Sequence, residues 1–206
     1  MTSLAPTLAI AAATVGALHA LAPDHWVPVA AVSRARGWSL ARTARVALLC
    51  GFGHVTVSAA LGLLALVSGR AVVESVGART GAVGGVLLIG FGVAYALVGL
   101  RRLVERHEHG HRHDARTTWT LFLIYCADPC VAVVPIIFAA APLSSAATLA
   151  IVVVYEVATI ATMVAFTLVT RAGATIVRGH WVERYGDSAA GGLIVATGVV
   201  VALAGW

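Results

Sequence analysis

Residues Leu4–Ser33 read LAPTLAIAAATVGALHALAPDHWVPVAAVS, a run with no lysine or arginine and with Asp24 as its one acidic side chain. A transmembrane helix needs about 20 mostly apolar residues, so this run is longer than a single bilayer crossing requires. Pro23 and Pro28 interrupt it, and a proline inside a helix removes a backbone donor and pushes against the carbonyl four residues earlier. We therefore expect a transmembrane helix that is broken near Pro23. No basic residue precedes the run, which favours a permanent helix over a cleaved signal peptide.

The composition of the whole chain indicates the same environment. Of its 206 residues, 60% are hydrophobic and 11% are charged, and the mean hydropathy is +0.93. A water-soluble domain with this balance would lack the polar side chains needed to cover its surface. We predict an all-α polytopic membrane protein whose main surroundings are the lipid bilayer.

Five further charge-poor runs follow the first one. They cover residues 40–68, 81–100, 118–141, 146–170 and 188–206. The sequence therefore predicts about six transmembrane helices. They would form one domain over residues 1–206, because the remaining loops are too short for a soluble domain.

Arginines are distributed unevenly among the links between these runs. Twelve flank the first, third and fifth links, two lie in the second link, and the fourth has none. Because positive residues accumulate on the cytoplasmic side, we expect both termini to be extracytoplasmic in the plasma membrane. Topology also accounts for the formal net charge of +5, so no nucleic-acid partner is expected.

Two short segments resemble each other. Ala22–Val27 reads APDHWV and Ala127–Ala132 reads ADPCVA, and each lies in the first run of a three-run half. At a similar distance downstream, His54 in the first half pairs with Glu156 in the second. Two halves with three spans each have opposite orientations in the membrane. The similarity between the segments therefore predicts a 3+3 inverted repeat whose first and fourth helices are broken by proline, with a site near the midplane.

His19, Asp24 and His25 form an H-x4-D-H pattern within the first run. An ionisable group at membrane depth costs about 2.5 to 3.5 kcal/mol, so three together indicate a function. Pro23 should free the carbonyl of His19 and Pro28 that of Asp24. Imidazole with oxygen ligands suits nickel, cobalt or zinc better than magnesium or calcium. The alternative is a hydrogen-bonded network that only fixes the helices.

Four further residues in the apolar runs are candidate metal ligands: His54, Asp128, Cys130 and Glu156. Pro129 should open its helix at the carbonyl of Tyr125. Cys126 precedes Cys130 by one helical turn and is a weaker candidate, since buried cysteines often serve as small apolar side chains. His54 alone could also be a helix-packing residue.

A histidine-rich loop at residues 104–116 separates the two halves, which cover about 1–103 and 117–206. It reads HEHGHRHD from His107, and its candidate metal ligands are His107, His109, His111 and His113. Short histidine tracts bind divalent metals. The alternative is a flexible, solvated linker on the predicted cytoplasmic side.

At these residues the chain resembles the nickel/cobalt transporter superfamily, in particular its six-span branch of nickel/cobalt exporters and urease-accessory membrane proteins. His19–His25 matches the H-x4-D-H signature, and Gly53–Val57 resembles the second G-H-[ST]-x-V motif. The resemblance implies metal recognition by His19, Asp24, His25 and His54. Asp128–Cys130 is similar to a motif of the exporter branch that the uptake branch lacks, so the direction of transport stays open. A permease of this kind carries Ni²⁺ or Co²⁺ as its substrate, needs no cofactor and is not an enzyme.

Three other functions would need different residues or a different metal. A membrane thiol-disulfide electron carrier would use Cys126 and Cys130, but it would need a cysteine where the first half has His25. An exporter of another divalent metal is a further alternative. An intramembrane metalloprotease would show HExxH, which does not occur. The sequence decides neither the preferred metal, nor proton coupling, nor whether the chain forms a homo-oligomer.

Overall fold

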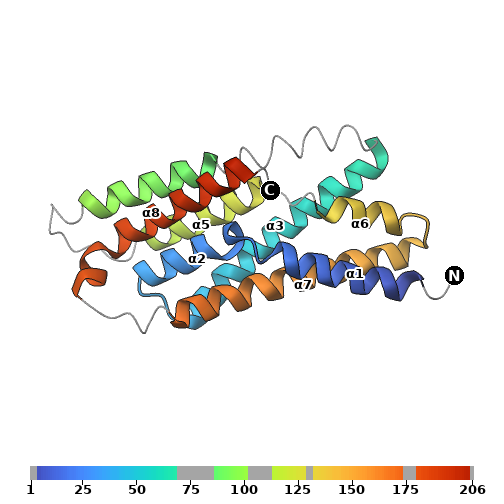
Figure 1. Cartoon of the computed structure of the whole chain (residues 1–206), viewed down its shortest axis with the longest axis horizontal. Helices are drawn as coiled ribbons and strands as arrows, with labels where there is room; N and C mark the ends of the chain where they lie inside the picture. Colours follow the sequence, from blue (N-terminus) through green and yellow to red (C-terminus); the bar gives the residue numbers. More distant parts are fainter. Residues whose placement is uncertain (1–3, 69–85, 102–112, 129–131, 174–179, 205–206) are drawn as a thin grey trace.

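A computed structural model describes residues 4–68, 86–101, 113–128, 132–173 and 180–204, and every regular element in these ranges is a helix (Figure 1). The helices are α1 Leu4–His19, α2 Pro23–Ala35, α3 Leu40–Ser68, an unlabelled helix Val86–Arg101, α5 His113–Ala127, α6 Val133–Ala140, α7 Ser145–Gly173 and α8 His180–Ala204. The all-α prediction is thus confirmed for the described residues. Two boundaries differ from the prediction: α5 begins at His113, inside the predicted loop 104–116, and α8 begins at His180, eight residues before the apolar run at 188–206.

Membrane-spanning character is clearest in two helices, α3 over Leu40–Leu66 and α7, both of which are long and apolar enough to cross a bilayer. A third span is added when α1 and α2, bent by 50°, are taken as one broken span. Large apolar side chains on the outside, such as Ile10 and Leu203, are 70% and 83% exposed. These features are compatible with membrane insertion.

The predicted break of the first span is confirmed. α1 ends at His19 and α2 begins at Pro23, where the missing N–H of proline costs nothing because the first helical donors have no intrahelical partner. One detail of the prediction is wrong, since the His19 carbonyl is not free: it accepts a hydrogen bond from the N–H of Ala22 at 3.0 Å. The turn between the two helices supplies the donor that Pro23 lacks. Pro28 lies inside α2, which continues past it.

The fourth predicted span is also divided, since α5 ends at Ala127 and α6 begins at Val133. Pro129, to which this break was ascribed, lies outside the described residues.

Three pairs of helix contacts correspond between the two halves, although the extensive packing of α2 on α8 is not one of them. α1 packs on α7 as α5 packs on α3, α2 packs on α7 as α6 packs on α3, and α2 packs on α3 as α6 packs on α7. Two glycines allow close helix crossings near the histidines: a Cβ at Gly16 would lie 2.7 Å from the Tyr155 carbonyl on α7, and one at Gly53 would lie 2.5 Å from the Phe122 ring on α5. These two crossings lie next to His19 and His54 and position them in the interior.

Candidate metal centre

Three histidines from three helices converge inside the bundle. His19 ends α1, His25 lies in the first turn of α2, and His54 lies in the middle of α3. One ring nitrogen from each lies within 4.8 Å of the others. His25 and His54 are both 3% exposed. The bend between α1 and α2 makes this possible, because on a straight helix of about 100° per residue His25 would point well away from His19.

Hydrogen bonds identify which ring nitrogens carry protons. His25 Nδ1 lies 3.0 Å from a carboxylate oxygen of Asp24, and His54 Nδ1 lies 3.3 Å from the backbone carbonyl oxygen of Tyr125. A carboxylate and a carbonyl can only accept hydrogen bonds, so each Nδ1 is assigned as the protonated nitrogen. In the neutral rings, both Nε2 atoms therefore carry lone pairs.

The two Nε2 atoms of His25 and His54 face each other at 3.3 Å. Two nitrogen ligands of one tetrahedral ion, with bonds of about 2.0–2.1 Å, are about 3.3–3.4 Å apart. The Nε2 atom of His19 is buried without a hydrogen-bond partner among the described residues. A proton shared between the first two nitrogens would satisfy them but would leave His19 unpaired, whereas one cation would satisfy all three. The widest of the three nitrogen pairs is at most 4.8 Å apart, so it would need to close by up to about 1.5 Å to match the spacing of two tetrahedral ligands.

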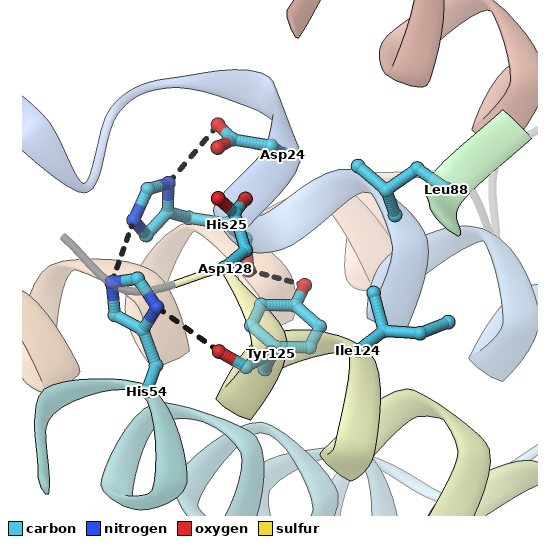
Figure 2. Close-up of a pocket in the computed structure, with 7 residues that line it drawn as sticks. All are labelled: Asp24, His25, His54, Leu88, Ile124, Tyr125 and Asp128. Atoms are coloured by element: carbon cyan, nitrogen blue, oxygen red, sulfur yellow. Dashed lines mark hydrogen bonds and ion pairs between the residues drawn. The ribbon is translucent and has the colours of Figure 1, made fainter. Parts of the chain in front are cut away.

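Tyr125 holds two parts of the cluster in place. Its carbonyl orients the ring of His54, and its hydroxyl donates a hydrogen bond of 2.7 Å to the backbone carbonyl of His25 (Figure 2). Hydrogen bonds to the second nitrogen of a ligating histidine fix its tautomer and orientation. The Tyr125 carbonyl is the one that the sequence predicted to lose its helical donor at Pro129. The sequence did not identify the hydroxyl, because its partner lies 100 residues away.

A small pocket adjoins the cluster and brings in a second carboxylate (Figure 2). It is lined by Asp24, His25, His54, Leu88, Ile124, Tyr125 and Asp128. The centre of a water-sized sphere can move within about 10 Å³ of this pocket, so the pocket has roughly enough room for one water molecule or ion. Asp24 comes from the break of the first span and Asp128 follows the last residue of α5 at the other break. Both interruptions therefore supply a carboxylate to one pocket.

The other predicted site residues lie elsewhere. Glu156 is half-buried on α7 and is not among the residues that line the pocket. Its neighbour Tyr155 faces α1 at Gly16. A role for Glu156 in the site therefore stays a prediction. Outside the described residues lie Cys130, His107, His109 and His111, together with the side chain of His113 at the start of α5.

Comparisons of the chain with models of protein families, with curated proteins and with solved structures gave no match. What the site does is therefore inferred from its own residues and geometry.

Proposed function

We propose that the chain is a permease that moves a transition-metal ion, Ni²⁺ and/or Co²⁺, across the cell membrane through the His19, His25 and His54 cluster. The observation that carries this proposal is the convergence of one ring nitrogen from each of three imidazoles. The Nδ1 atoms of His25 and His54 are bound to acceptors, and the Nε2 atom of His19 is buried without a partner among the described residues. The ion is the substrate, and no resident cofactor or chemical reaction is required.

Charge balance supports a divalent cation. Moving such an ion into a low-dielectric interior is costly unless opposite charges lie nearby. Asp24 and Asp128 line the same pocket and can supply two negative charges, which offset the ion. Neutral imidazoles then replace water in its coordination shell, and these ligands favour nickel, cobalt or zinc over magnesium or calcium.

The corresponding helix contacts of the two halves support a 3+3 inverted repeat. Each half would contribute one broken helix, and the substrate site lies where the two breaks meet, as in many secondary transporters. Rocking of one half against the other would expose the site alternately to each side. We keep six spans, extracytoplasmic termini and a plasma-membrane location as parts of this proposal, together with the resemblance to the nickel/cobalt transporter superfamily.

Radioactive nickel accumulation in cells that express the protein tests the proposal. Expression should change accumulation relative to empty cells, upward for uptake or downward with raised tolerance for export. His25→Ala and His54→Ala should abolish the change while the protein still reaches the membrane. His180→Ala, which alters a histidine at the start of α8, is the matched control and should retain it. Wild-type flux in both cluster variants would refute the site, and parallel cobalt and zinc assays rank the metals.

One observation bears on the thiol alternative. Cys50 is buried, and it lies close enough to Cys126 for the two thiols to interact electrostatically. The electron-carrier alternative uses Cys126, which is partly exposed, and Cys130, which lies outside the described residues. A relay through Cys50 would need a thiol that external partners can reach, and Cys50 is fully buried. If Cys50→Ala with Cys126→Ala leaves metal flux intact, the pair has a packing role. Loss of flux that a reductant also produces in the wild type would favour redox chemistry.

A further inference from the structure

The last turn of α7 contains a buried arginine that is far along the helix from the metal centre. Arg171 is 9% exposed, and its Nη2 atom donates a hydrogen bond of 3.0 Å to the backbone carbonyl of Trp38. Its Nε and Nη1 atoms are buried and have no hydrogen-bond partner in the described part of the chain. The guanidinium is thus anchored at one nitrogen and unsatisfied at the other two.

A second unsatisfied donor lies on the same face of α7. Thr167 precedes Arg171 by four residues, which places the two side chains one above the other. Its side chain is fully buried, and its Oγ1 atom has no hydrogen-bond partner among the described residues. A buried polar group without a partner costs free energy, and a buried charge costs more. Two such groups side by side indicate that an acceptor is missing.

The local charge specifies what kind of acceptor is missing. Arg34, in the last turn of α2, lies close enough to Arg171 to interact with it electrostatically. No carboxylate among the described side chains pairs with Arg171. The partial negative charge at the C-terminus of α7 offsets some of the positive charge but offers no acceptor to Nε or Nη1. An anion with several acceptor oxygens would satisfy these donors and offset the two positive charges.

We propose that Arg171 and Thr167, with Arg34 beside them, bind a phosphate group. A guanidinium binds phosphate through several charge-assisted hydrogen bonds, and a threonine hydroxyl adds a neutral one. The ends of α2 and α7 meet the start of α3 at one end of the bundle (Figure 1). In a membrane-spanning helix such as α7, the terminal turns lie at the depth of lipid headgroups. A phospholipid headgroup and a free phosphate ion share this chemistry.

The test uses the full-length protein in a maltoside detergent, which contains no phosphate. The melting temperature is followed by tryptophan fluorescence during titration with inorganic phosphate or phosphatidylglycerol, against sodium chloride at equal ionic strength. We expect at least one phosphate source to raise the melting temperature of the wild type by several degrees. A response to phosphatidylglycerol alone identifies a lipid site, and a response to inorganic phosphate identifies a site for the soluble ion.

Variants separate the site from general electrostatics. Arg171→Lys keeps the charge but replaces the planar fork of five N–H donors with a single ammonium that carries three, and it should weaken the apparent affinity at least tenfold. Thr167→Val keeps the shape and should weaken it a few-fold. Arg45→Lys is the matched control, because Arg45 is exposed and bonds to the Ala41 carbonyl of its own helix, and its response should equal that of the wild type.

Two results would overturn the phosphate site. One is a wild-type melting temperature that neither phosphate source changes beyond the chloride control. The other is an Arg171→Lys response equal to that of the wild type. If Arg171→Lys does not fold, the Thr167→Val variant takes its place, and a Thr167→Val response equal to that of the wild type overturns the site. None of these outcomes depends on metal transport.

Discussion

The two helix breaks differ in what they bring to the pocket. The break between α1 and α2 supplies His19, Asp24 and His25, whose side chains carry lone pairs and charge. The break after α5 supplies the carbonyl and hydroxyl of Tyr125, which orient other groups, and the Asp128 carboxylate. In the proposed site, similar proline-containing segments would thus have different roles, one in ligation and the other in support and charge balance. Perturbing each break in turn tests this division.

The largest difference in Ni²⁺ affinity is expected between variants of the two carboxylates. Asp24→Asn removes the charge that orients and polarises His25, and groups bound to a ligating histidine typically contribute about 10–100-fold to metal affinity. Asp128→Asn removes a charge from the pocket with no described bond to a ligating ring, so its effect should be less than about tenfold. Isothermal titration with Ni²⁺ in detergent compares the two. Equal losses would contradict the division of roles.

Acidification should weaken metal binding, because it protonates the histidines of the cluster. A histidine binds a metal only as neutral imidazole, so protons compete with the ion, and affinity should be highest at neutral to alkaline pH. Lowering the pH from about 8 to about 5 should reduce Ni²⁺ affinity by more than about tenfold. The comparison with His54→Ala is informative, because any residual binding should depend less steeply on pH. A flat profile in the wild type would contradict competition between protons and the ion for these imidazoles.

Tyr125→Phe should have a smaller effect. The variant keeps the carbonyl that holds His54 but leaves the His25 carbonyl without its buried donor. One such hydrogen bond contributes about 0.5–1.5 kcal/mol, so we expect a loss of stability of this size and a fall in metal affinity of about tenfold or less. Thermal unfolding and nickel titration measure the two quantities. Tyr185→Phe on α8 is a control for the loss of a hydroxyl away from the pocket, and it should leave nickel affinity unchanged.

Glu156→Gln should have the smallest effect. Glu156 is half-buried and does not line the pocket, so the loss of its charge should change Ni²⁺ affinity by less than about twofold. A larger fall would show that Glu156 reaches the transport path in another conformation of the protein. That result would agree with the sequence repeat, which pairs Glu156 with His54. Flux under a pH gradient provides a second readout, because a role in proton coupling would change that response without changing affinity.

Local chemistry explains which features the sequence could predict. Pro23 predicts the break, and the H-x4-D-H pattern around it contains two of the three histidines that converge, because both follow from neighbours in the chain. The free His19 carbonyl was wrongly predicted, because the turn after α1 supplies a donor that a helical rule does not anticipate. The bond from the Tyr125 hydroxyl to His25 joins residues 100 apart. The bond from Arg171 to Trp38 joins residues 133 apart. Such contacts depend on how the helices pack and leave no local pattern.

X-ray absorption spectroscopy of the nickel-loaded protein tests the central claim most directly. The three-histidine site predicts imidazole nitrogen ligands at about 2.0–2.1 Å in the wild type. It also predicts the loss of one of them in His54→Ala. Coordination by oxygen alone, or an unchanged spectrum in His54→Ala, would contradict the assignment of the metal centre.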